Sequence, residues 1–523
     1  MIRPPSPRQP WWLAPLSRRA RWALVSGLAM GAAAAAVAHD WPSPGPGVPS
    51  QPPPGLVWAG PEQGAPAEPQ ASDCARPPRS FSVASGLPMP GPQPGWREPS
   101  PPPVPMLGSV ARTLSAPTAK AAPAMAASPA APGRAERASA DSAAVVSASP
   151  SMALSASVSP PQQPGVPSTQ ATQPAVTAGR VDDNSAFGEF RRFLERHQGL
   201  VQRPLTVDNR VRVSIVDAQG RPVPDVALRV QDGAGAELPV WARTDAGGQA
   251  WLMPQADARW RGEAAPWVVT ARTRVGGQVL SQQMQWRPGQ RDALQIRLEG
   301  AKPSRPRMDV AFVIDATGSM ADEIDKLKRS MRSVAASVAS MPGSPVVCYA
   351  LVAYRDRSDA FYVRASDFTD DLNAFQKDLA ALQAGGGGDY PEAQNEALHT
   401  AIHQLSWRGS ATARVIVLLA DAPPHQDYGA PHADHNARAA AARGIKVMGI
   451  AASGMDRAGE LVMRQVSQFT GGRFVFLTYD NPDDPASGPG RHTNHEVSNY
   501  SVQPLDRLVA RLLREEMARW PGA

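Results

Sequence analysis

Residues 308–320 read MDVAFVIDATGSM, and the rest of the chain is interpreted outward from this stretch. The run from Val310 to Ile314 is apolar and rich in β-branched side chains, which predicts a strand buried on both faces. The run stops at Asp315, and apolar residues then return at helical spacing over about 320–341, which predicts an amphipathic helix. The turn between them therefore lies at the carboxyl end of a strand, where open α/β sheets bind their ligands.

Oxygen-bearing side chains occupy every second position of this turn, as Asp315, Thr317 and Ser319. A small hard cation such as Mg²⁺ takes a few oxygen ligands from a protein and keeps water or a ligand oxygen in its remaining positions. The three side chains are therefore candidate ligands of a divalent cation.

Two further segments give the chain a resemblance to the von Willebrand factor A (VWA) domain with a metal-ion-dependent adhesion site. Residues 385–392, GGGGDYPE, lie where the family's second metal loop is expected, and residues 415–421, VIVLLAD, read as a buried strand ending in the family's last carboxylate. The resemblance covers about 307–480 and implies a protein partner bound at the metal face, without catalysis. It implies that Mg²⁺ or Mn²⁺ is held by Asp315, Thr317, Ser319, Asp389 and Asp421.

Asp389 departs from the common form of the family, which has a neutral threonine there, and is similar to a sub-branch with aspartate. A third carboxylate over-neutralises a divalent ion, so the metal should be held more firmly and an acidic ligand repelled more strongly. At an effective dielectric constant of about 20, one added charge at about 4 Å is worth about 4 kcal/mol before solvent screening. This amount can decide between a ligand-capturing site and a mainly structural one.

Two enzyme classes also place an aspartate or a serine after a buried strand. The phosphotransferase motif D-x-D-x-T needs a second aspartate where this chain has Thr317, so no carboxylate stands there for general acid–base chemistry. A serine hydrolase needs G-x-S-x-G, whereas the sequence around Ser319 is TGSMA. We therefore expect no enzyme activity. A metal-dependent hydrolase or phosphotransferase is the weaker alternative, beside a structural envelope component whose metal only stiffens the loops.

Strands and helices alternate from residue 307 onward, which predicts an α/β domain with a doubly wound, mostly parallel sheet. The expected strands are 309–314, 346–354, 361–364, 414–420, 445–451 and 473–477, with helices near 320–341, 371–383, 392–406, 434–443 and 457–470. The strand at 361–364 is expected at an antiparallel edge. Residues 481–523 are expected to form a loop and a helix over about 505–520 that packs back on the folded part.

Residues 205–300 change to a period of two, with about seven short strands, which predicts an all-β sandwich. The spacings D-x-x-G-x-P-V and T-D-x-x-G-x-A resemble the prealbumin-like sandwich of carboxypeptidase-regulatory domains. Ahead of it, residues 181–204 form a connector with phenylalanines at helical spacing. This stripe predicts a short helix that docks on the next domain.

The first 180 residues differ from the rest in composition. Five arginines precede the apolar segment 22–38, which ends in AVA and predicts a signal peptide over 1–38. Because 17 residues approach the length of a bilayer span, an uncleaved membrane anchor is the alternative. Either form would export the rest, to the periplasm, the cell envelope or the outside. Of the 56 prolines, 36 lie before residue 181, so 39–180 is expected to be a disordered linker.

The charge, the cysteines and the histidines of the chain bear on nucleic-acid binding, disulfides and zinc. The net charge of +6 owes much to the basic leader, and without a basic stripe or motif we expect no nucleic-acid partner. Cys74 lies in the linker and Cys348 in a predicted strand, so no disulfide is expected. His425, His432 and His435 do not form H-E-x-x-H, so zinc is not expected and they are predicted to be exposed loop residues. The alternative for His425 is that it lines the rim of the upper face together with Tyr428.

Overall fold

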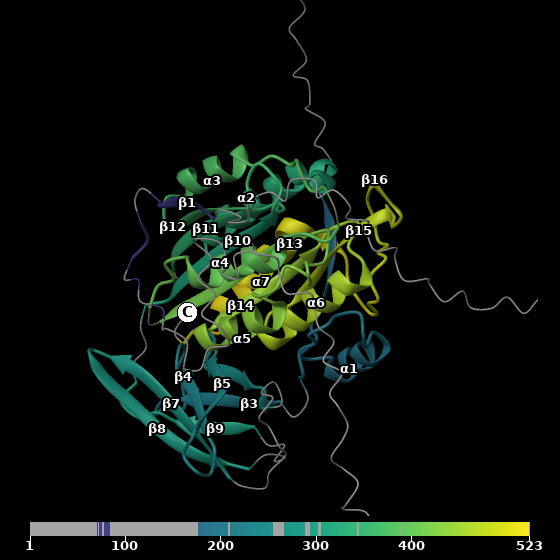
Figure 1. The fold of residues 1–523 in the computed structure, drawn as a ribbon. Coiled ribbons are helices and arrows are strands. Elements are labelled where there is room, and N and C mark those ends of the chain that lie inside the picture. Colours follow the sequence, from purple (N-terminus) through teal and green to yellow (C-terminus); the bar gives the residue numbers. More distant parts are fainter. Residues whose placement is uncertain are drawn as a thin grey trace, which may run out of the picture.

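The computed structural model describes residues 69, 71, 73–75, 78–83, 176–207, 210–254, 266–287, 293–301, 305–341, 345–388, 390–409 and 411–521. These residues form an α/β domain with a β-sandwich docked beside it (Figure 1). The predicted leader and most of the predicted linker lie outside the described residues. Within the described ranges, no helix has the length and apolar character needed to cross a membrane.

A ten-stranded sheet forms the centre of the α/β domain, in the order β1-β12-β11-β10-β13-β14-β15-β2-β17, with β16 paired to β15. The bounds are β1 Ser80–Val83, β2 Thr177–Val181, β10 Arg307–Asp315, β11 Val346–Tyr354, β12 Val363–Thr369, β13 Thr412–Ala420, β14 Ile445–Ala451, β15 Phe474–Asn481, β16 Asp484–Pro489 and β17 Gln503–Pro504. The five central strands, from β11 to β15 in this order, are parallel. The predicted fold class is confirmed.

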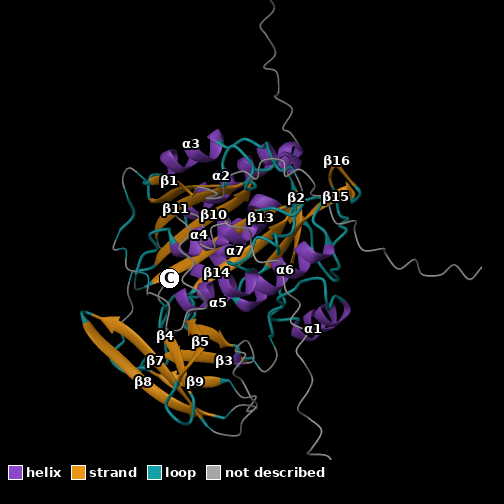
Figure 2. Cartoon of the chain, viewed as in Figure 1, coloured by secondary structure: helices purple, strands orange, loops and turns teal. Residues whose placement is uncertain are grey.

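Helices cover both faces of the sheet (Figure 2). Their bounds are α2 Ile324–Ala339, α3 Leu372–Ala381, α4 Gln394–His403, α5 Ala433–Arg443, α6 Arg457–Phe469 and α7 Leu505–Met517. Strand β10 shows how the sequence specifies two layers. Val310 and Phe312 pack with α2, α3 and α7, whereas Ala311 and Val313 pack with α4, α5 and α6. Because successive side chains point to opposite faces, a continuous apolar run serves both cores.

Two segments of the predicted linker belong to the sheet. β2 pairs antiparallel with β15, and β1 pairs antiparallel with β12, which makes β1 and not β12 the outer strand on that side. The linker prediction was therefore wrong for these residues. The edges of an existing sheet supply hydrogen-bond partners to a short segment, and composition alone does not reveal this.

The predicted connector helix is present as α1, Phe187–Arg196. Phe190 and Phe193 are buried against the α/β domain, and the guanidinium of Arg464 on α6 lies 4.0 Å from the centre of the Phe193 ring. The helix therefore docks on the α/β domain, and it also contacts the start of the sandwich, where the guanidinium of Arg210 lies 3.6 Å from the centre of the Phe187 ring. The aromatic stripe predicted the helix correctly but carried no information about which surface it would meet.

The β-sandwich consists of a three-stranded sheet, β6-β3-β9, and a four-stranded sheet, β5-β4-β7-β8. Its strands are β3 Val211–Val216, β4 Ala227–Gln231, β5 Glu237–Arg243, β6 Gln249–Leu252, β7 Trp267–Val275, β8 Gln278–Trp286 and β9 Leu294–Arg297. Alternate side chains from both sheets fill one apolar core, in which Trp267 and Trp286 meet edge to face at 5.5 Å.

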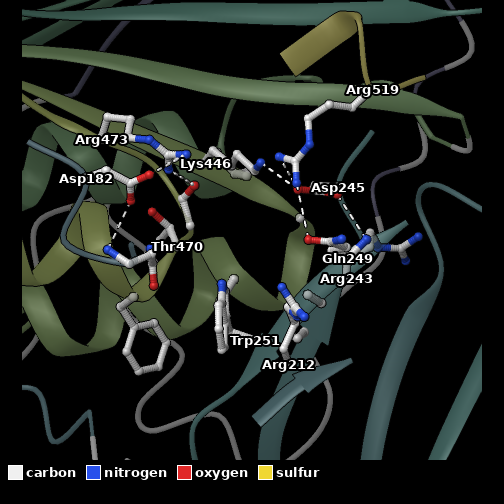
Figure 3. A pocket seen from close by; sticks show the side chains of 18 of the residues that line it. Asp182, Arg212, Arg243, Asp245, Gln249, Trp251, Lys446, Thr470, Arg473 and Arg519 are labelled. Atoms are coloured by element: carbon white, nitrogen blue, oxygen red, sulfur yellow. Dashed lines mark hydrogen bonds and ion pairs between the residues drawn. The ribbon is translucent and has the colours of Figure 1, made fainter. Parts of the chain in front are cut away.

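The sandwich docks where β13 and β14 begin. Asp225 of the sandwich receives a hydrogen bond from Arg414 at 2.8 Å, and Asp245 receives one from Lys446 at 2.8 Å (Figure 3). Arg414 and Lys446 lie near the amino ends of their strands. The sandwich therefore contacts the end of the sheet opposite to the turn that carries Asp315.

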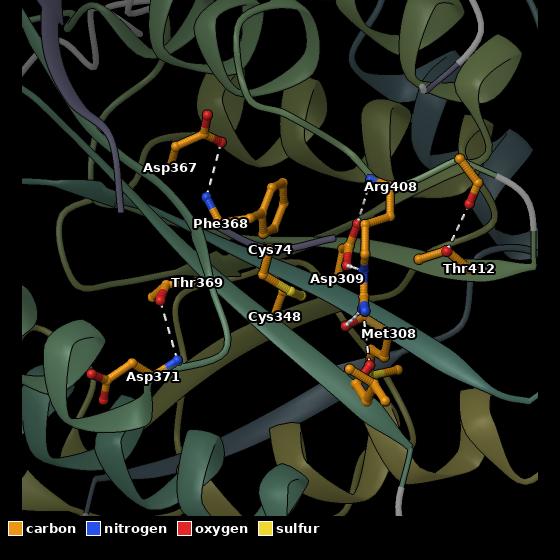
Figure 4. The surroundings of a disulfide bond; sticks show 12 residues. Cys74, Met308, Asp309, Cys348, Asp367, Phe368, Thr369, Asp371, Arg408 and Thr412 are labelled. Atoms are coloured by element: carbon orange, nitrogen blue, oxygen red, sulfur yellow. Dashed lines mark hydrogen bonds and ion pairs between the residues drawn. A yellow bond between two sulfur atoms is a disulfide. The ribbon is translucent and has the colours of Figure 1, made fainter. Parts of the chain in front are cut away.

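A disulfide joins Cys74 to Cys348 on β11, 274 residues away, with Cα atoms 6.1 Å apart (Figure 4). The prediction that the fold has no disulfide was wrong. The segment around Cys74 runs along the α/β domain, where the Ala75 backbone N–H donates to the Phe368 carbonyl at 2.9 Å. This contact and the pairing of β1 bring two cysteines together that are remote in sequence.

Cys74→Ala is expected to lower the free energy of unfolding by about 2–4 kcal/mol, because the bridge closes a very long loop and restricts the unfolded chain. Urea unfolding under oxidising conditions measures the loss. Wild-type protein in dithiothreitol should lose the same amount, while the variant should not respond to dithiothreitol. Equal urea midpoints for the oxidised wild type and the variant would contradict a stabilising bridge.

Candidate metal centre

The first loop of the candidate centre follows β10. Asp315 is fully buried, and its Oδ1 accepts hydrogen bonds from the Thr317 backbone N–H (3.0 Å) and the Thr317 hydroxyl (2.7 Å). The hydroxyl oxygens of Thr317 and Ser319 lie 3.0 Å apart, and Ser319 is exposed. The three side chains predicted on this loop therefore lie together at the end of a buried strand.

Asp421 follows β13, the parallel neighbour of β10, and is also buried. Burial, with the negative charge of Asp421, raises the pKa of Asp315 to about 7. Burial also raises the pKa of Asp421 to about 6, against the opposing effect of the Ser319 hydroxyl. Asp315 Oδ2 and Asp421 Oδ1 accept no hydrogen bond from the described part of the chain. Two neighbouring buried carboxylates with unsatisfied oxygens fit a divalent cation, which would stabilise their charged forms.

The glycine loop packs directly on the first loop. Gly318 N–H donates to the Gly386 carbonyl at 2.9 Å, and Gly387 N–H donates to an Asp359 carboxylate oxygen at 2.8 Å. Gly386 and Gly387 have φ values of 77° and 71°, and a Cβ on Gly387 would lie 2.8 Å from Cβ of Thr317. Both the backbone conformation and the lack of space therefore require glycine at position 387.

Asp389 lies outside the described residues, so its part in the centre stays a prediction. Among the residues that the structure describes, no group of three or more His, Cys, Asp or Glu side chains is placed to hold a metal ion. The described part of the centre offers two carboxylates and two hydroxyls. The remaining ligands of a divalent cation would come from Asp389, water or a partner.

Two acidic residues beside the centre, Glu323 and Glu392, were not among the predicted ligands. Glu323 is buried, accepts a hydrogen bond from the Tyr479 hydroxyl, and contributes to the raised pKa of Asp421. Glu392 is buried against the position that a Cβ on Gly387 would occupy. The GGGGDYPE motif was a signal for Glu392. Glu323 had none, because its position depends on packing against β15, which lies more than 150 residues away.

The histidines after β13 differ from the prediction of exposed loop residues, since His432 and His435 are half-buried at the start of α5. His425 is buried and stacks on Tyr428 with ring centres 3.6 Å apart. Burial alone would lower the pKa of His425, but Asp356 and Asp427 raise it above its ordinary value. The prediction failed because loop composition does not show that two strand-end loops fold over one another.

Comparison with known proteins identifies the domain. Residues 309–478 match the family described as von Willebrand factor A domain. A 99-residue stretch is 35% identical to von Willebrand factor A domain-containing protein 7 of Rattus norvegicus, and 118 residues are 27% identical to an ariadne-like RING finger protein of Acanthamoeba polyphaga mimivirus. These matches cover 18% and 23% of this chain, respectively. The chain spans only 10% and 11% of the length of these relatives. This chain therefore contains a VWA domain.

Solved structures similar to the chain include proximal thread matrix protein 1 from the mussel byssus. The match has 16% sequence identity and a TM-score of 0.25, and it covers 31% of this chain and 40% of the other. A likeness of this size supports no argument about function. The assignment of the VWA domain rests on the family match and on the parallel sheet.

Proposed function

We propose that this chain is an exported, envelope-associated protein that binds a protein partner through a divalent cation in its VWA domain, without catalysing a reaction. The observation that carries the proposal is the pair of buried carboxylates, Asp315 and Asp421, which end neighbouring parallel strands and each keep an oxygen without a hydrogen bond. Mg²⁺ or Mn²⁺ would be held by Asp315, Thr317, Ser319, Asp389 and Asp421. A bound cation would offer an open coordination position to an oxygen of the partner.

The residues of the chain prepare this face in three ways. Asp315 Oδ1 fixes the Thr317 hydroxyl beside Ser319, so the oxygen donors are oriented before a cation arrives. Ser319 is exposed, which leaves the site open to a partner. Tyr390, 51% exposed, directly follows Asp389 and presents an aromatic ring at the rim, the type of side chain that often anchors interfaces.

The position of the sandwich and the disulfide support two parts of this proposal. The first bears on access to the metal face, and the second on the location outside the cytoplasm. Because the sandwich contacts the amino ends of β13 and β14, it leaves the carboxyl ends free to meet a partner. The Cys74–Cys348 bridge is typical of an oxidising compartment, which agrees with the basic, apolar leader predicted over 1–38. We propose the periplasm, the cell envelope or the outside as the location, with the leader cleaved or kept as an inner-membrane anchor.

Asp315→Ala is expected to weaken binding of Mg²⁺ and Mn²⁺ at least 100-fold in isothermal titration calorimetry, because it removes a carboxylate and the group that orients Thr317. Asp325→Ala, at an exposed position on α2, serves as the matched control and should bind like wild type. Unchanged metal affinity in Asp315→Ala would end the proposal of a metal at this site.

Partner capture separates the adhesive function from a purely structural metal. Wild-type protein incubated with envelope fractions in Mg²⁺ should retain a protein that is lost with chelator and with Asp315→Ala. If the variant folds, binds no metal and still retains the same protein, the metal is structural. Turnover of generic phosphoester or ester substrates by the wild type, lost in the variant, would instead favour the hydrolase alternative.

A further inference from the structure

A cavity of about 300 Å³ lies where the sandwich, the VWA domain and the C-terminal helix meet. The sandwich lines it from β3, β5 and β6, the VWA domain from β14 and the loop after α6, and Arg519 closes one side (Figure 3). Small-molecule sites are often found at such domain junctions and begin at about this size. None of the functions proposed above uses this cavity.

Basic side chains outnumber acidic ones in the cavity wall. Five basic residues line it, namely Arg212, Arg243, Lys446, Arg473 and Arg519, and two acidic ones, namely Asp182 and Asp245. Arg243 forms an ion pair with Asp225, which lies outside the wall and also pairs with Arg414. Lys446 likewise has Glu516, at 2.6 Å. When Arg414, Asp225 and Glu516 are counted with the wall, six cations face four carboxylates, so the cluster keeps an excess of positive charge.

The carboxylates of the wall are each engaged. Asp182 pairs with Arg473 at 2.9 Å, and Asp245 is shared by Lys446 at 2.8 Å and Arg519 at 2.9 Å. Burial alone would raise the pKa of Asp245, but Lys446 and Arg519 hold it below its ordinary value. The acidic residue is thus ionised at neutral pH. Lys446 and Arg519 share Asp245 and also Glu516, so the excess positive charge of the cluster lies on Arg212 and on the two arginines that share Asp225.

The cavity wall exposes basic side chains to solvent. Arg212 on β3 is exposed and forms no ion pair with any residue of the described ranges, and the side chain of Arg519 is 38% exposed. The guanidinium of Arg210 lies 4.3 Å from the centre of the Trp251 ring. Burial lowers the pKa of Arg210 only to about 10, so this residue adds another positive charge at neutral pH. A solute entering from solvent therefore meets positive potential first.

We propose that this cavity binds a small oxyanion with two or three negative charges, of the phosphate or polycarboxylate class. The anion would contact Arg212 from the sandwich, Lys446 and Arg473 from the VWA domain, and Arg519 after α7. Guanidinium groups suit this role because their planar donors match carboxylate and phosphate oxygens in pairs. Bound between three parts of the chain, the anion would also stabilise the docking of the sandwich on the VWA domain.

The test is titration of the full chain with inorganic phosphate and, separately, with citrate. Divalent cations are left out because both probes bind them, and sodium chloride at equal ionic strength gives the screening baseline. Saturable binding and a rise in the unfolding temperature beyond that baseline are expected with at least one probe. The probe that binds identifies the class as phosphate or carboxylate.

Arg212→Gln and Arg519→Gln are each expected to weaken this binding at least tenfold. Arg274→Gln, which removes an exposed arginine of the β7–β8 hairpin that does not line the cavity, is the matched control and should stay within twofold of wild type. Arg212 has no ion pair within the described structure, so its variant should fold normally. Equal affinity in Arg212→Gln, Arg519→Gln and Arg274→Gln, or no binding beyond the chloride baseline, would overturn the proposal.

Discussion

Asp309→Ala is expected to lower the free energy of unfolding of the VWA domain by about 3–5 kcal/mol, because it leaves Arg408 buried without its counter-ion. Asp309 is fully buried in β10, and Arg408 donates to it from its backbone N–H at 2.8 Å and from Nε at 2.6 Å. Arg408 Nη2 also donates to the carbonyls of Met308 and Val346. The pair thus ties the start of three strands together, including the strand that ends at Asp315.

Urea unfolding followed by tryptophan fluorescence, to which the buried Trp407 beside Arg408 contributes, measures this loss. The combined variant Asp309→Leu with Arg408→Met is the control. It should recover most of the stability, because apolar residues often replace a buried ion pair at little cost, whereas one partner left alone is destabilising. A loss below about 1 kcal/mol in the single variant would show that water reaches Arg408 and that the pair is not a true core element.

Local patterns in the sequence were sufficient for the central sheet. The strands predicted at 346–354 and 445–451 have the same bounds in β11 and β14, because each is an apolar run bounded by turn-forming residues. The cluster of Asp315, Thr317 and Ser319 was predictable for the same reason, since all three lie on one short turn. Strand order and parallel pairing then place Asp421 at the end of the strand next to β10.

Contacts between remote segments were not predictable from these patterns. The disulfide at Cys74 and the pairing of β1 occur within a segment whose composition resembles a linker. The burial of His425 depends on a neighbouring loop, and the position of Glu323 near the centre depends on β15. Periodicity reports which face of an element is apolar, but it does not report which other element covers that face. Asp389 remains a prediction from the resemblance.

Asp225→Asn is expected to lower the free energy of unfolding of the sandwich by about 3–5 kcal/mol and to loosen its docking, because two buried arginines lose a shared counter-ion. Asp225 is buried between Arg243 at 3.1 Å and Arg414 at 2.8 Å, and these side chains are also buried. Burial alone would raise the pKa of Asp225, but the two arginines hold it below its ordinary value. Asparagine keeps the shape of the side chain and tolerates the φ of 60°, so the variant isolates the charge.

Unfolding of the sandwich can be followed by hydrogen exchange of the backbone amides of Trp267 and Trp286 in its core, and docking by the rate of proteolysis between the two domains. Asp232→Asn is the matched control, since Asp232 also accepts backbone hydrogen bonds, from Ala234 and Ala236, but lies in an exposed turn. This control should lose less than about 1 kcal/mol. If Asp225→Asn behaves like the control, the ion pair with Arg414 does not hold the sandwich in place. The ion pair of Asp245 with Lys446 and the packing of β5 beside α5 would then have to account for the docking.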